Sequence, residues 1–99
     1  MGFNITVSPI AKNNVREAIA YYKKEVSVKA AQNFVKDYEL TLNKIKQNPY
    51  FQIYYKDFRG LPLKKYPYVI FYQVDETQNL ILVKAVFNAY QDTKKRPDL

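Results

Sequence analysis

The side chains of this sequence that could do chemistry are mainly cations and tyrosines. Arg59 comes shortly before Lys64 and Lys65 in the chain. Further along, Tyr90 precedes a run of three cations, Lys94-Lys95-Arg96. Guanidinium and ammonium groups bind phosphate and carboxylate oxygens, and Arg does so in a bidentate geometry. These residues therefore predict a surface for a polyanion or an acidic protein, and with a tyrosine they could act on a phosphate.

Each of these residues also has a structural explanation. Arg59 could hold a loop in place through backbone carbonyls or through Asp57. Lys64 and Lys65 could protect a solvated strand edge against aggregation. Tyr90 could pack as a surface residue against a sheet, and the terminal cations could form a solvated tail.

The residue types that are absent restrict the chemistry further. The sequence contains neither Cys nor His, which excludes disulfides, thiolate metal sites, cysteine nucleophiles and imidazole bases. Its acids suggest no catalytic pair, because Asp75 and Glu76 lie in a predicted turn and Asp92 stands alone beside the basic tail. We therefore expect no metal and no cofactor. Any catalysis would have to come from Arg, Lys and Tyr, so the sequence favours binding over an enzymatic activity without deciding between them.

Length and composition predict one small globular domain over residues 1–99. A chain of 99 residues, 47% of them hydrophobic, can bury a single core. Its formal charge of +7 favours acidic partners. The first residues lack the basic and apolar regions of a signal peptide, and no apolar run approaches the ~20 residues of a membrane span. We expect a cytoplasmic protein that does not contact a membrane.

The first half of the chain predicts a strand and two helices. Phe3 to Val7 alternates as a short strand, which Ser8-Pro9 ends. From Ile10 to Lys24 apolar residues recur at helical spacing. After Ser27, a candidate N-cap, a second helix continues to Asn48-Pro49. Its apolar stripe consists of Ala31, Phe34, Val35, Tyr38, Leu42 and Ile45. The short link predicts that the helices form an antiparallel hairpin.

The second half changes to strand periodicity. An irregular aromatic stretch over 50–58 precedes a candidate strand over 60–65, in which Pro62 indicates an edge or a position outside the hydrogen-bond ladder. Residues 68–74 and 80–87 predict a central hairpin around a turn at 75–79. The order β-α-α-β-β-β defines an α+β fold, with the helical hairpin packed on one face of a small, mostly antiparallel sheet.

Three tyrosines of the predicted sheet have two interpretations. Tyr66, Tyr68 and Tyr72 alternate along one face, with Ile70 expected on the other. They could form a platform on which nucleic-acid bases stack. Because a small sheet needs one apolar face against its helices, we favour the interpretation that they belong to the core.

Four blocks of the chain, taken in order, carry a family resemblance. They are Ala20-Tyr21-Tyr22, Ile45-Lys46-Gln47-Asn48-Pro49, Arg59-Gly60-Leu61-Pro62-Leu63-Lys64-Lys65-Tyr66-Pro67-Tyr68-Val69-Ile70-Phe71-Tyr72, and Ala85-Val86-Phe87-Asn88 onward to Asp92. In this order and spacing they resemble the RelE/ParE toxin family, the small toxins of type II toxin–antitoxin operons, also known as plasmid stabilisation proteins. The resemblance covers nearly the whole chain.

The resemblance implies one of two activities. RelE-like toxins cleave mRNA on the ribosome, where a ribose 2′-OH attacks the next phosphate. In that branch the catalytic candidates would be Arg59, Lys64, Tyr90 and Lys94. Two positions at which that branch carries Arg hold Val69 and Ala89 in this sequence, which argues against efficient cleavage. ParE-like toxins poison DNA gyrase, and the match over residues 59–72 resembles that branch more closely, so we favour a ParE-like toxin.

The charges and the resemblance together indicate the partners. We expect the target-binding surface to comprise Arg59, Lys64, Lys65, Asn88, Tyr90, Lys94, Lys95 and Arg96. The resemblance implies a cognate antitoxin whose acidic segment folds on binding, DNA gyrase or the ribosome as target, and operator DNA bound only through the antitoxin complex. It also implies a homodimer or a heterotetramer with the antitoxin. A direct nucleic-acid binder and a decayed toxin that binds only its antitoxin stay open as alternatives.

Overall fold

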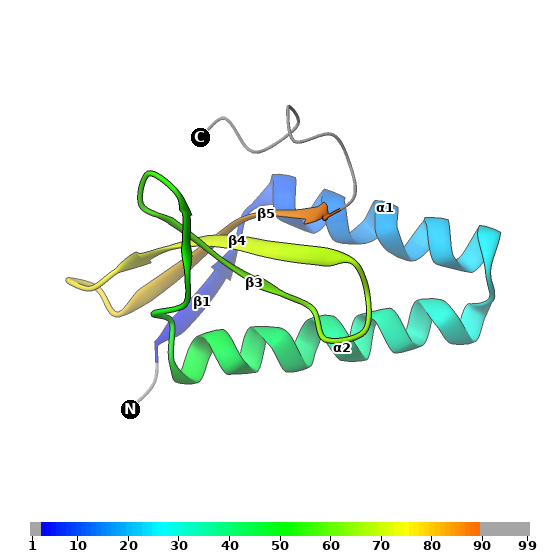
Figure 1. Cartoon of the computed structure of the whole chain (residues 1–99), viewed down its shortest axis with the longest axis horizontal. Helices are drawn as coiled ribbons and strands as arrows, with labels where there is room; N and C mark the ends of the chain where they lie inside the picture. The colour runs from blue at the N-terminus through cyan, green and yellow to red at the C-terminus, as the bar shows by residue number, and fades with distance from the viewer. Residues whose placement is uncertain (1–2, 90–99) are drawn as a thin grey trace.

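The chain forms an α+β fold, which a computed structural model describes over residues 3–89 (Figure 1). In chain order the elements are β1 (Asn4–Val7), α1 (Pro9–Glu25), α2 (Val28–Gln47), β2 (Ile53–Tyr55), β3 (Phe58–Pro62), β4 (Tyr68–Asp75) and β5 (Leu80–Asn88). The two helices run side by side in opposite directions along one side of the sheet (Figure 1). This confirms the predicted helical hairpin on a mostly antiparallel sheet.

Two serines fix where the helices begin. The Ser8 hydroxyl accepts a hydrogen bond from the Ala11 N–H at 3.0 Å, and Pro9 occupies the first turn of α1, where proline is favoured. Ser27 caps α2 in the same way, with its Oγ 3.0 Å from the Ala30 nitrogen. The predicted N-cap at Ser27 is confirmed, and Ser8-Pro9, expected only to end a strand, also starts the first helix.

The sheet has the strand order β1-β5-β4-β3-β2, in which β1 is parallel to β5 and the other pairs are antiparallel. The predicted central hairpin is confirmed as β4 and β5. Its turn ends at Asn79, which has a φ of 51°, a left-handed conformation that Asn tolerates better than most residues.

Two strand boundaries differ from the sequence prediction. The stretch over 50–58, expected to be irregular, contains the short strand β2, which pairs with the start of β3. The strand expected over 60–65 runs instead from Phe58 to Pro62, so Lys64 and Lys65 lie beyond its end. Pro62 pairs with β4 while β2 does not reach it, as expected for a proline at an edge position.

A bulge in β5 determines how the sheet meets α1. The pairing of β5 with β4 skips Lys84, whose carbonyl oxygen accepts the Ser8 hydroxyl at 3.0 Å. Two residues on, the Val86 N–H donates to Oδ1 of Asn14 at 3.0 Å. These bonds tie α1 to β5, and the extra residue brings apolar side chains before and after the bulge onto the same face.

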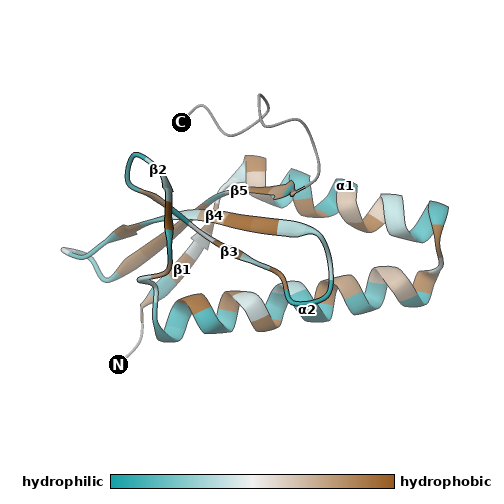
Figure 2. Ribbon diagram, viewed as in Figure 1, coloured by the Kyte–Doolittle hydropathy of each residue, from teal (hydrophilic) through white to brown (hydrophobic). Residues whose placement is uncertain are grey.

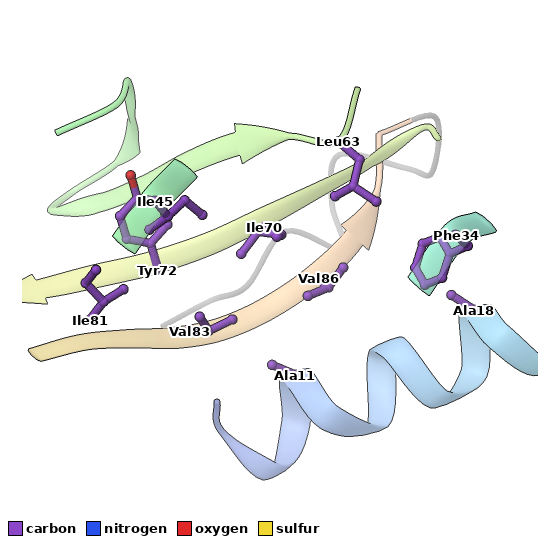
Figure 3. Packing of buried hydrophobic residues seen from close by; sticks show 10 residues of the cluster. All are labelled: Ala11, Ala18, Phe34, Ile45, Leu63, Ile70, Tyr72, Ile81, Val83 and Val86. Atoms are coloured by element: carbon purple, nitrogen blue, oxygen red, sulfur yellow. The ribbon is translucent and has the colours of Figure 1, made fainter. Parts of the chain in front are cut away.

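The core lies between the helical hairpin and one face of the sheet (Figure 3). Its buried members are Ala11, Ala18, Phe34, Ile45, Leu63, Ile70, Tyr72, Ile81, Val83 and Val86. Along the helices hydrophobic and hydrophilic positions alternate, whereas the middle of β4 is hydrophobic (Figure 2). In Figure 3, Ala11 of α1 points toward β5, where a small side chain lets the helix approach closely.

The tyrosines of the sheet belong to this core, as we favoured. Tyr72 is fully buried, and the rings of Tyr66 and Tyr68 lie 5.7 and 5.2 Å from that of Phe34 on α2. The expectation that Ile70 lies on the opposite face is wrong, because residues two apart on a strand share a face and Ile70 is buried in the same cluster.

Candidate functional site

The loop between β3 and β4 carries two of the predicted cations and is held to α2 by Asp37. The Asp37 carboxylate, in a residue that is 5% exposed, accepts three backbone hydrogen bonds. Oδ1 accepts from the Lys64 N–H at 3.2 Å, and Oδ2 accepts from Lys65 at 2.7 Å and from Tyr66 at 3.2 Å. The Tyr66 hydroxyl also donates to the Ala30 carbonyl at 3.2 Å. The loop is therefore fixed to the helix along its length.

The lysine side chains of this loop remain available to a partner. Lys64 and Lys65 are exposed, whereas Leu63 just before them is buried. Because backbone N–H groups satisfy Asp37, neither ammonium group is used to neutralise it. Both lysines follow the end of β3, so they do not protect a strand edge. We refer to residues 63–67 as the basic loop.

The end of β5 lies next to the basic loop. The Ala89 N–H donates to the Pro67 carbonyl at 2.6 Å, and Asn88 pairs in register with Tyr68. Burial raises the pKa of Tyr68, and a hydrogen bond from the Asn88 side chain opposes that rise. Both lysines, Tyr68 and Ala89 line one hollow of about 490 Å³. The structure thus brings Asn88 and the two lysines together at one end of the sheet.

Arg59 lies away from the basic loop, near the start of β3. Its Nη1 donates to the Phe51 carbonyl at 2.8 Å, and the guanidinium lies 5.3 Å from the centroid of the Tyr50 ring. The Tyr50 hydroxyl in turn donates to Glu76 at 2.7 Å. This geometry supports the structural alternative, in which Arg59 holds the segment before β2 through a backbone carbonyl. Arg59 therefore does not lie beside Lys64 at the basic loop.

A hollow at the opposite end of the sheet is lined by acidic residues. Asp57, Asp75 and Glu76 line this shallow hollow, and among the described residues no cation lies in its wall. Their partners are neutral: the Gln73 amide donates to Asp57, and the Thr77 hydroxyl donates to Asp75. The predicted turn role of Asp75 is confirmed. The hollows at the two ends of the sheet therefore differ in charge, because carboxylates line this one and Lys64 and Lys65 line the one at the basic loop.

The sheet face that points away from the helices is apolar at the position of Val69. Val69 and Phe71 are each 7% exposed, and the Tyr54 ring packs edge-on against Phe71 at 5.3 Å. The Phe87 ring lies 6.3 Å from Phe71. Gly60 allows this packing, because a Cβ there would lie 2.8 Å from the Tyr54 ring. Where RelE-like toxins carry one of their arginines, this chain has a buried hydrophobic residue.

Aromatic packing beneath the site changes tyrosine ionisation. Burial, reinforced by the neighbouring Tyr68, Tyr66 and Tyr21, raises the pKa of Tyr22 to about 12. Burial also raises the pKa of Tyr72, whose hydroxyl donates to the Pro49 carbonyl at 2.7 Å. Both hydroxyls stay protonated at neutral pH, and that of Tyr72 serves as a structural hydrogen-bond donor.

The remaining predicted site residues, Tyr90 and the run Lys94-Lys95-Arg96, lie outside the described residues. Within residues 3–89, no group of three His, Cys, Asp or Glu side chains could hold a metal ion. Neither of the described helices is both long and apolar enough to span a membrane.

Sequence reasoning missed Asp37, the residue that positions the basic loop. A signal was present, because Asp37 follows Phe34 by three residues and precedes Thr41 by four, and all three are buried on one face of α2. A charged residue within a buried helical stripe requires partners. The position of Asp37 in the stripe is therefore enough to indicate an anchoring role.

A helical hairpin on a five-stranded mixed sheet defines a small α+β protein. A family model described as the ParE toxin of the type II toxin–antitoxin system parDE matches residues 5–93. The chain therefore belongs to the ParE toxin family. No curated protein sequence matches it at a significant level.

Several solved structures share the fold. A chain of the chromosomal ParDE toxin–antitoxin system from P. aeruginosa has 13% identity and a TM-score of 0.76, covering 87% of this chain and 95% of that one. The RelBE2 toxin–antitoxin complex from Mycobacterium tuberculosis has 9% identity and a TM-score of 0.61, covering 89% and 99%. The isolated E. coli RelE toxin has 14% identity and a TM-score of 0.54, covering 93% and 89%. At such identities the likeness shows the fold alone.

Proposed function

We propose that this ParE-family chain acts by binding a macromolecular target such as DNA gyrase, and that a cognate antitoxin neutralises it. The observation that carries the proposal is the buried Val69. Cleavage of mRNA through a 2′-OH needs a cation beside the phosphate to stabilise the developing charge. On the outer face of the sheet, Val69 and Phe71 present hydrocarbon at that point.

The basic end of the sheet supports a binding role. Lys64 and Lys65 project from a loop that Asp37 fixes, and Asn88 lies beside them. A preorganised pair of cations binds an acidic partner at a lower entropic cost than two lysines on a mobile loop. We propose that these three residues, together with Tyr90 and the run Lys94-Lys95-Arg96, contact the target.

Fold likeness and charge support an antitoxin partner. Two of the similar structures are described as toxin–antitoxin systems or complexes, and this chain has a formal charge of +7. An acidic segment that folds on binding suits such a surface. Binding to operator DNA would then occur through the antitoxin complex.

Induced expression of the chain, with and without the gene beside its own, tests the target. We expect growth arrest with altered plasmid supercoiling and trapped gyrase–DNA complexes, and intact messages. Messages cut at codon boundaries with unchanged supercoiling would show a RelE-like endonuclease instead. Growth without arrest would indicate a decayed toxin.

Two charge-removing variants test the binding surface. The pair Lys64→Ala and Lys65→Ala should weaken toxicity, while the matched pair Lys29→Ala and Lys36→Ala on exposed positions of α2 should not. Equal effects of the two pairs would mean that only the net charge matters. Replacing the run Lys94-Lys95-Arg96 by alanine should abolish toxicity, and unchanged arrest would remove that segment from the proposed surface.

A further inference from the structure

A second hollow lies between α1 and the ends of β4 and β5. Its volume is about 520 Å³, and its polar wall consists of Asn14, Glu17 and Tyr21 from α1 with Tyr68 and Asn88 from the strands. Tyr68 also lines the hollow of the basic loop. The two hollows are therefore neighbours at the basic end of the sheet.

The charge of this hollow is opposite to that of its neighbour. Among the described residues, Glu17 is the only charged one in its wall, whereas Lys64 and Lys65 are the charged ones in the wall of the other. Glu17 is exposed, and among the described residues no cation pairs with its carboxylate. On a chain with a formal charge of +7, an unpaired carboxylate in a hollow marks a local preference for a cation.

Two tyrosines, Tyr21 and Tyr68, line the same hollow as this carboxylate. Tyr21 is 56% exposed, although its neighbour Tyr22 packs into the core beside Phe34 at 5.5 Å. The Tyr21 ring stands edge-on to Tyr22 at 5.3 Å, which holds it at the rim. Tyr68 is half-buried and hydrogen-bonded by Asn88. Two tyrosine rings beside a carboxylate match the requirements of a planar cation, which can form an ion pair and stack at once.

We propose that this hollow binds an arginine side chain presented by a partner protein, with its guanidinium paired to Glu17 and stacked on Tyr21 or Tyr68. Arginine fits better than lysine, because guanidinium is planar, weakly hydrated and able to stack on an aromatic face. The inference goes beyond the proposed function, since neither gyrase binding nor neutralisation by an acidic segment requires a cation on the partner. Together the two hollows would bind a partner segment in which an arginine lies next to an acidic residue.

Nuclear magnetic resonance titration of the full chain tests the proposal with N-acetyl-arginine amide as the probe. Its uncharged isostere, N-acetyl-citrulline amide, is the ligand control. We expect saturable shifts at the amides of Glu17, Tyr21 and Tyr68 with the arginine probe. The citrulline probe should bind on the order of five-fold more weakly, the effect of one partly exposed ion pair.

Two glutamates in the middle of exposed helical faces provide matched variants. Glu17→Gln should reduce binding of the arginine probe to the level of the citrulline probe, and Glu39→Gln on α2 should leave it unchanged. Equal binding of both probes, binding insensitive to Glu17→Gln, or no saturable shift would overturn the proposal. The assay needs no toxicity, so a chain that does not affect gyrase can still pass it.

Discussion

Replacing Asp37 by asparagine tests whether one carboxylate fixes the basic loop. Asn has the same shape, so the change leaves no cavity, but it has one acceptor oxygen in place of two. Asp37 accepts three backbone hydrogen bonds, with donor–acceptor distances of 2.7 to 3.2 Å. The substitution therefore removes one or two of these bonds and turns an NH₂ group toward backbone N–H donors.

The expected loss of stability follows from those bonds. A hydrogen bond to a charged group contributes about 1.5–3 kcal/mol, and the loop is open enough for water to replace part of what is lost. We expect the free energy of unfolding to fall by about 2–3 kcal/mol, which for a domain of this size lowers Tm by roughly 10–20 °C. Amide hydrogen exchange at Lys64, Lys65 and Tyr66 should accelerate more than exchange in β4.

Urea denaturation and hydrogen exchange measure the two effects. Asp57→Asn is the matched control, because Asp57 is exposed and bonds only a side-chain amide. Its effect should stay below about 0.5 kcal/mol. If Asp37→Asn costs no more than this control and leaves exchange of the loop amides unchanged, then Asp37 does not position the lysines and the argument for a preorganised surface fails.

Three further substitutions test other contacts. Gly60→Ala should destabilise the fold by about 1–3 kcal/mol in urea denaturation, because the new Cβ would lie 2.8 Å from the Tyr54 ring; a Tyr54→Ala background should remove most of that cost. Tyr72→Phe leaves the Pro49 carbonyl without its buried donor and should cost about 1–2 kcal/mol by the same assay, and a neutral effect would mean that water replaces the hydroxyl. The pKa of Tyr22 is raised from 10.0 to about 12, so between these values the unfolded state releases a proton that the folded state keeps. Stability should therefore decline as pH rises from 10 to 12, and Tyr22→Phe should flatten the decline measured by denaturation across that range.

Local signals in the sequence were sufficient for the helices and the central hairpin. Ser27 caps α2 and Asn48 ends it, because capping depends on residues within one turn. The β-branched and aromatic residues of β4 and β5 likewise indicate strands from local sequence alone. The α+β class of the fold and the pairing of β4 with β5 follow from these elements.

Features that depend on distant residues were not predictable in this way. The strand β2 is only three residues long and exists through its pairing with β3, and the bulge at Lys84 is satisfied by Ser8, 76 residues away in the chain. Lys64 and Lys65 lie outside the expected strand because the Asp37 carboxylate on α2 accepts hydrogen bonds from their backbone N–H groups. Each of these features depends on contacts between residues that lie far apart in the sequence.

The way the carboxylates are satisfied explains why the positive charge of this chain remains available. Asp37 is bound by backbone N–H groups, Asp57 by an amide and Asp75 by a hydroxyl. All of these partners are neutral, so among the described residues these acids neutralise none of the lysines. Neutral donors stabilise a carboxylate without using a cation. These acids therefore leave the charge of the basic loop uncompensated, and such a surface favours an acidic partner.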